Sequence, residues 1–301
     1  MINNKTGLAK LMASRNKLLN DLQKKLEAAA TQAGEVMYDE IINRVIDKLD
    51  KDENGNIRNN MYNKRLISSI DLAFSSYYTS EGIGLASEIA SGAMQVVNFQ
   101  SGYYSNFTTQ ASLLPIKPLV METVQTWLGI GEKGRLEKNG YLVKIAQAAE
   151  VKQAVRDITL KGIVGGQGWQ DTKFAIKDYI KGNPQSNPFD WLNKYTRNFV
   201  YDTYAQIDRT TGRMFADKLG FQFAVFEGGI IKTTREWCNE RNGKVFHISE
   251  IERFDPGKSM QPNYNPVTDL GGWGCRHHLN WIPDSLAVIL RPDAQKFLQA
   301  A

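Results

Sequence analysis

The chain of 301 residues has few of the side chains that bind soft metals or form covalent bridges, with only two cysteines and three histidines. Two cysteines are too few for a disulfide framework, and in a reducing cytoplasm we expect them to be free or metal-bound. No window of the sequence has the apolar length of a transmembrane helix, and basic residues interrupt the apolar runs near the N-terminus. We therefore expect neither stable membrane insertion nor a signal peptide.

The sequence also lacks a dense run of charge of one sign. The net charge of +5 arises between residues 132 and 220, where 15 Lys or Arg face 10 Asp or Glu. Such a mild excess is compatible with contact with a polyanion such as DNA. It is more often simply the solvated surface of a helical protein, and the charge alone leaves both interpretations open.

Apolar periodicity predicts that most of the chain is helical. Residues 8–49 repeat leucine and other apolar side chains at three- and four-residue spacing, with Gly34 as a point at which the helix could divide. Similar patterns predict helices over 141–160, 171–180 and 191–219. The expected front of the molecule is therefore an elongated helical part.

Several shorter segments are expected to connect or interrupt these helices. Residues 221–233 alternate with a period of two around a Gly-Gly pair, which predicts a β-hairpin. Residues 162–168 predict a glycine-rich loop, 113–118 an extended connector, and 183–188 a break in the chain. The expected fold is mainly α with a small C-terminal α+β module.

Composition divides the chain into three expected regions: a helical arm and low-charge assembly region over 1–131, a basic helical region over 132–220, and the α+β module over 221–301. Between Leu72 and Gly131 only four residues are charged. Such a surface solvates poorly, so we expect most of it to be buried, within the subunit or between subunits. A homo-oligomer or a multi-copy assembly is the expected state.

One acidic segment matches part of a calcium-binding loop. Asp50–Ile57 places oxygen-bearing side chains at the first, third and fifth positions and glycine at the sixth. The twelfth position, where a bidentate glutamate is needed, is Met61. We therefore interpret the segment as a polar turn between helices.

All cysteines and histidines of the chain lie between Cys238 and His278. One interpretation is a structural zinc site with ligands from Cys238, Cys275, His277 and His247, and His278 is a further candidate. A second is a disulfide between the two cysteines, and a third is a packed core in which the thiols act as small hydrophobic groups. The usual spacings of zinc modules are absent, so all three interpretations stay open.

Catalysis by this cluster is a weaker hypothesis. Cys275 beside His277, or Cys238 near His247, could form a thiolate nucleophile with its base. A glycine loop that carries a cysteine beside arginine and tryptophan is equally typical of a rigid structural turn, and no cluster of carboxylates for a divalent metal is evident. We therefore expect no enzymatic activity, and a nucleic-acid-processing or toxin-like enzyme is the alternative.

The cysteines belong to two half-motifs. The first reads Thr-Arg-x-x-Cys-x-x-Arg-x-Gly-Lys from Thr234, and the second reads Gly-Gly-x-x-Cys-Arg-His from Gly271, followed by a tryptophan. Together they resemble the C-terminal domain of tailed-phage minor head proteins of the Mu F-like family, over about residues 195–282. The positions that carry the motif beside the cysteines and histidines are Arg235, Arg241, Gly243, Lys244, Gly271, Gly272, Arg276 and Trp281.

The resemblance implies a virion structural protein that is made in the host cytoplasm and enters the capsid during head assembly, near the portal. Its implied partners are the portal and other head proteins, and packaged DNA is a further implied contact. The resemblance does not extend to the first 150 residues.

Overall fold

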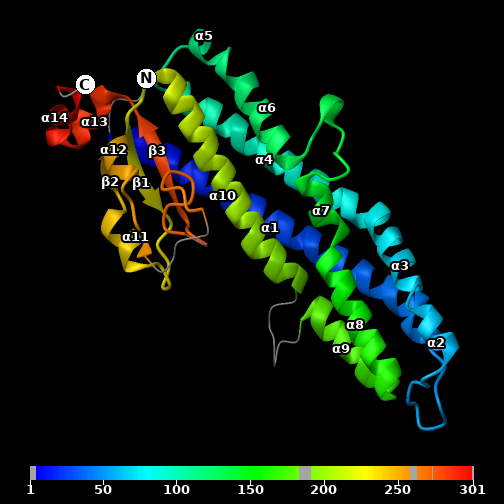
Figure 1. Ribbon diagram of the computed structural model, residues 1–301. Coiled ribbons are helices and arrows are strands. Elements are labelled where there is room, and N and C mark those ends of the chain that lie inside the picture. Colours follow the sequence, from blue (N-terminus) through cyan, green and yellow to red (C-terminus); the bar gives the residue numbers. More distant parts are fainter. Residues whose placement is uncertain (1–4, 183–190, 258–262, 273, 300–301) are drawn as a thin grey trace. The chain divides into compact units, whose positions relative to one another are not determined.

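The computed structural model describes residues 5–182, 191–257, 263–272 and 274–299, with only the backbone described for Lys5 and 191–201 (Figure 1). The predicted break at 183–188 lies outside the described residues. The remaining chain is mainly helical with one three-stranded sheet near the C-terminus, which confirms the expected fold class. None of the helices within these ranges combines the length and apolar character needed to cross a bilayer.

The chain forms two compact units, and each gathers segments that are distant in sequence. Unit 1 contains residues 1–23, 91–126 and 200–301, and unit 2 contains residues 24–90 and 127–199. This arrangement differs from the three consecutive regions expected from composition, because long helices carry the chain from one unit into the other and back. The candidate site lies wholly in unit 1.

Unit 2 is built mainly from helices. Its elements are the C-terminal part of α1 (Lys5–Arg44), η1 (Ile46–Lys48), α2 (Met61–Leu66), α3 (Ser69–Tyr77), η2 (Tyr78–Gly82), the start of α4 (Ile83–Tyr104), the end of α6 (Ile116–Leu128), η3 (Glu132–Gly134), α7 (Tyr141–Gln147), α8 (Ala149–Gly165), α9 (Trp169–Lys181) and the start of α10 (Trp191–Leu219). The apolar stripe of α1 is buried here at Leu26, Met37 and Ile41, as its spacing predicts. Gly34 does not divide this helix.

The turn between α8 and α9 is shorter than predicted. The helix continues through Gly162 to Gly165, and only residues 166–168 connect it to α9. A side chain on Gly162 would place its Cβ 2.6 Å from Thr172 Oγ1, so this glycine allows the two helices to approach closely. The predicted helix over 141–160 is in turn interrupted at Ala148, whose φ is 45°.

The segment 50–57 folds as the polar turn that the sequence predicts. Asp52 Oδ1 accepts hydrogen bonds from the backbone N–H groups of Asn54 at 3.0 Å and Asn56 at 2.8 Å. The Asn56 amide donates to the other carboxylate oxygen at 3.2 Å. The Asp52 carboxylate, at the third position of the loop, is thus bound by its own loop.

The segment 113–118 is a tight turn between two helices, and the prediction of an extended connector is wrong. It contains the end of α5 (Gln110–Leu113) and the start of α6. Pro118 is the third residue of α6, and in the first turn a missing backbone N–H removes no helical hydrogen bond.

The low-charge stretch from Leu72 to Gly131 buries one face of its helices. Large apolar side chains remain exposed on the other face, among them Leu72 at 63% and Leu114 at 64%. Burial of that second face between subunits stays a prediction.

Unit 1 surrounds the small sheet. Its further elements are β1 (Phe223–Gly228), α11 (Glu236–Arg241), β2 (Lys244–His247), α12 (Ile248–Ile251), β3 (His277–Ile282), α13 (Asp284–Leu290), η5 (Pro292–Ala294) and α14 (Gln295–Leu298). β1 lies between β2 and β3 and is antiparallel to both, and the short helices α11 to α14 lie around this sheet in Figure 1. All six residues of β3 are buried.

The hairpin predicted over 221–233 does not form. β1 is a strand as expected, but it pairs with β2 and β3, and Ile231 lies in a turn closed by two hydrogen bonds with Thr234. The physical reason is pairing with more distant segments: β2 covers one edge of β1 and β3 covers the other, so neither edge is left for a strand over 230–233. Gly228 permits this register, since a Cβ there would lie 2.3 Å from the Arg276 carbonyl oxygen.

Candidate metal centre

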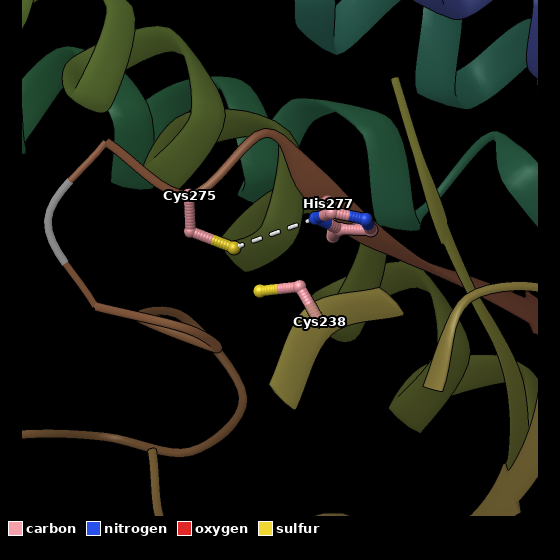
Figure 2. A group of neighbouring side chains, drawn as sticks. All are labelled: Cys238, Cys275 and His277. Atoms are coloured by element: carbon pink, nitrogen blue, oxygen red, sulfur yellow. Dashed lines mark hydrogen bonds between the residues drawn. The ribbon is translucent and has the colours of Figure 1, made fainter. Parts of the chain in front are cut away.

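Two half-motifs that are separated in sequence meet at one buried group of side chains. Cys238 lies on α11, Cys275 lies at the end of the loop that leads to β3, and His277 is the first residue of β3. Figure 2 shows the two sulfurs facing each other, with the imidazole of His277 beside them. The potential ligand atoms of the three residues all lie within 4.8 Å of one another. All three side chains are at most 3% exposed.

Glycines in the loop before Cys275 allow this approach. Gly272 and Gly274 have φ angles of 80° and 68°, which side-chain-bearing residues rarely adopt. Gly271 packs directly on the sulfurs: a Cβ at this position would lie 2.6 Å from Cys238 Sγ and 3.1 Å from Cys275 Sγ. The Gly-Gly pair of the second half-motif is therefore a spatial requirement of the two cysteines.

The two thiols shift each other's pKa in opposite directions. Cys238 donates a hydrogen bond to Cys275, and this bond lowers the pKa of Cys275 and raises the pKa of Cys238. Burial opposes ionisation of Cys275, whereas His277 and the positive charge of Arg209 favour it. The arrangement thus prepares Cys275 as a thiolate, the form that binds a metal or acts as a nucleophile.

The spacing of the three side chains suits a metal ion. Cys275 Sγ lies 3.9 Å from His277 Nδ1. Two ligands of a tetrahedral zinc ion lie about 3.5 to 3.8 Å apart, given the usual Zn–S and Zn–N lengths. A small movement would bring all three ligands to bonding distance. Two thiolates and an imidazole are also the ligand types that zinc prefers.

The His277 ring has its Nδ1 toward Cys275 and packs on β1. It stacks on Phe226 with the centroids 5.0 Å apart, and its Nε2 has no hydrogen-bond partner among the described residues. Within the described residues, the group contains no carboxylate, so it offers three ligands and not four.

His247 does not join this group, although the sequence makes it a candidate ligand. His247 pairs with Phe223 at one end of β1, whereas His277 pairs with Gly228 at the other end, about 17 Å away at the usual rise per strand residue. Its Nδ1 lies 2.8 Å from the Ser249 hydroxyl and its Nε2 lies 3.0 Å from the Gln222 side-chain oxygen. His247 caps α12 and is not a metal ligand.

His278 also lies outside the group, because successive strand residues point to opposite faces. Its Nδ1 lies 2.7 Å from Asp208 Oδ2, and both side chains are 1% exposed. Arg15 and Gln100 add hydrogen bonds to the same buried polar cluster, to Asn280 and Asp208 respectively. Although burial acts to raise it, the pKa of Asp208 falls to about 2 because of His278, Arg15 and the hydrogen bond from Gln100.

The remaining motif residues have structural contacts on the elements that carry the site. Arg241 lies over the ring of Trp237 at 4.1 Å and donates to the Trp237 carbonyl oxygen at 2.9 Å. Gly243, with a φ of 78°, donates its N–H to Phe226 and turns the chain from α11 into β2, where Lys244 is exposed. Trp281 is fully buried on β3.

The sequence interpretation missed the residue that holds the second half-motif in place. Arg209 of α10 is 3% exposed and donates hydrogen bonds to three carbonyl oxygens of the site loop: Thr268 at 2.7 Å, Cys275 at 2.6 Å and His277 at 2.8 Å. A signal was present, since Asp208 and Arg209 fall among the apolar positions of α10 between Tyr204 and Phe215. Arg15 likewise interrupts the apolar stripe of α1.

The structure also bears on the disulfide and nucleophile hypotheses. Cys238 and Cys275 are both free thiols here, although their sulfurs are neighbours. Cys275 and His277 form a thiol–imidazole pair, but the alternative pair of Cys238 with His247 is not formed.

A pocket of about 290 Å³ opens onto the three side chains. Arg235 and Arg276 of the two half-motifs line it, together with Thr233 and Thr234.

Comparison of the chain with protein-family models, with curated proteins and with solved structures finds no match in any of the three.

Proposed function

We propose that the chain is a virion structural protein, a minor head protein of a tailed phage that acts in head assembly near the portal. The observation that carries the proposal is the convergence of the two half-motifs of the Mu F-like resemblance. Cys238 of the first lies beside Gly271, Cys275 and His277 of the second, and Arg209 holds the second by its backbone carbonyl groups. A motif whose parts meet in one buried site is better explained by shared folding than by chance.

We further propose that zinc binds to Cys238, Cys275 and His277 and stabilises unit 1. The metal would join α11 to the start of β3. Because such a site does not exist in the unfolded chain, the binding free energy of the ion adds to the stability of the fold.

Ion pairs within the chain argue against DNA as the main partner of the 132–220 region. Several basic residues of the 132–220 region pair with acidic side chains, including Arg156 with Asp71 at 2.9 Å and Lys173 with Asp47 at 3.3 Å. Such pairs reduce the positive charge that a polyanion would meet. We therefore propose the portal and other head proteins as the main partners, with DNA as a secondary contact.

This role is tested by deleting the gene for the chain from the phage genome. We expect heads to lose infectivity, and a tagged copy supplied in trans to sediment with purified heads and to restore infectivity. The Cys275→Ser variant should be incorporated poorly. Lys218→Met, which changes an exposed residue away from the metal site, should be incorporated normally. Infectious heads formed without the chain, or a chain that stays in the soluble fraction, would contradict the proposal.

A nucleic-acid-processing or toxin-like enzyme is the second candidate, and the contact of Cys275 with His277, together with the lowered pKa of this thiol, favours it. The two roles predict different behaviour of Cys275→Ser. An enzyme would keep its stability and lose turnover, whereas a structural centre would lose metal and unfold more easily. Denaturation of this variant therefore separates the candidates without knowledge of a substrate.

A further inference from the structure

The metal centre has three protein ligands and a neighbouring pocket. Zinc sites that only hold a fold together usually have four protein ligands, whereas sites with three leave a position for an outside ligand. Within the described residues, the group is limited to Cys238, Cys275 and His277. All three line the pocket of about 290 Å³, so a fourth position on the metal would face this space.

The lining of the pocket determines which ligand suits that position. Zinc bound to two thiolates and a neutral imidazole has no net charge. Arg235 and Arg276 add positive charge at the wall, and the charge of Arg235 acts directly on Cys238. Guanidinium groups bind the paired oxygens of carboxylates and phosphates especially well.

We propose that the fourth coordination position takes an oxyanion of the carboxylate or phosphate type, with Arg235 and Arg276 holding its remaining oxygens. The inference rests on the proposed metal site and goes beyond a purely structural role for it. The ligand is either a small anion or an acidic group carried by a head protein, and both present the same oxygen chemistry to the metal.

Asp202 of α10 is the competing ligand. Its Oδ1 accepts a hydrogen bond from the Gly274 N–H at 3.1 Å, close to Cys275. Burial raises the pKa of this carboxyl group to about 6. Its oxygens also lie outside the group of potential ligand atoms that are within 4.8 Å of one another.

Cobalt substitution tests the inference, because tetrahedral cobalt thiolate centres absorb visible light in a way that depends on the fourth ligand. The full-length chain is freed of metal, loaded with Co²⁺ and titrated with inorganic phosphate and, separately, with acetate, at constant ionic strength set by chloride. We expect a saturable change of the visible bands with at least one of the two anions. The apparent affinity should fall about tenfold or more in the Arg235→Gln/Arg276→Gln double variant. Lys218→Gln removes one exposed positive charge and should leave the titration unchanged.

The outcomes distinguish the two proposals. Cobalt bands that neither anion changes, or that change equally in the double variant, would overturn the oxyanion site and leave the metal site standing. Bands that respond to Asp202→Asn but to neither anion would assign the fourth position to Asp202 and would also overturn the inference. If no cobalt thiolate bands form, the metal site itself is wrong.

Discussion

Replacement of Arg209 by methionine should strongly destabilise unit 1. The guanidinium donates to the carbonyl oxygens of Thr268, Cys275 and His277 in a buried setting. Hydrogen bonds to charged groups contribute about 1.5 to 3 kcal/mol each, and a buried acceptor left without a partner costs a similar amount. Since one side chain serves all three carbonyl oxygens, their contributions are not additive, and we expect a combined loss of about 4 to 6 kcal/mol.

This loss is a large fraction of the roughly 5 to 15 kcal/mol by which domains are stable. Urea denaturation followed by circular dichroism measures the loss, and hydrogen exchange of the β3 amides shows whether it is local to unit 1. Arg209→Lys keeps the charge, but a single ammonium nitrogen cannot donate to all three carbonyl oxygens as the guanidinium group does. An intermediate loss of about 2 to 3 kcal/mol is therefore expected.

The exposed residue Lys218 lies on the same helix and provides the control. Lys218→Met should change the free energy of unfolding by less than about 0.5 kcal/mol. If Arg209→Met cost less than about 1 kcal/mol, the hydrogen bonds to the site loop would not be what holds it, and the reasoning would be refuted.

Three further predictions concern the same unit. Gly271→Ala should cost about 1 to 3 kcal/mol in thermal or urea unfolding because its Cβ meets both sulfurs, whereas Gly229→Ala, with open space around it, should be neutral; equal effects would contradict the packing. Since the pKa of Asp208 is depressed to about 2, its contribution to stability is present above its unfolded pKa near 4 and is lost as the pH falls toward 2. Asp208→Asn should remove about 2 kcal/mol from the fall in the free energy of unfolding at acid pH. If the free energy of unfolding of this variant fell with acid as it does in the unchanged chain, the role given to Asp208 would be refuted. A zinc chelator should lower the melting temperature, since an ion at 100 times its dissociation constant contributes about 2.7 kcal/mol; no shift in a zinc-loaded sample would count against the metal.

The helices could be predicted from the sequence because their apolar side chains repeat with the helical period. α1, α9 and α10 occupy nearly the predicted residues, since burying such a stripe depends little on which surface receives it. The errors arose where distant segments decide. β1 is completed by β3, some 50 residues later in the chain, and no local pattern identifies that partner.

The candidate site was predicted in part. The clustering of cysteine and histidine and the two glycine-rich half-motifs indicated that Cys238, Cys275 and His277 belong together, and they do. His247 was a wrong inclusion, because the register of β1 places it at the opposite end of the strand. Arg209 was missed although its place among apolar residues of α10 signals a buried polar contact, because its acceptors are backbone carbonyl groups that no sequence pattern identifies.

The charged cluster around Asp208 could not be predicted from the sequence either. Its members come from α1, α4, α10 and β3, so each is an isolated polar residue within an apolar pattern. Such a residue signals a buried polar contact, but the partner is set by the tertiary structure alone. A polar side chain within an apolar stripe therefore indicates that a buried polar contact exists, whereas its neighbours in sequence do not indicate which residue it contacts.

The metal content of the purified full-length chain tests the central claim most directly, namely that the two half-motifs meet to form one metal centre. Elemental analysis should find about one zinc per chain. Cys238→Ser, Cys275→Ser and His277→Ala should each lose the metal, whereas His247→Ala should retain it. A chain that contains no zinc after purification and reconstitution, or that loses it equally with His247→Ala, would contradict the account.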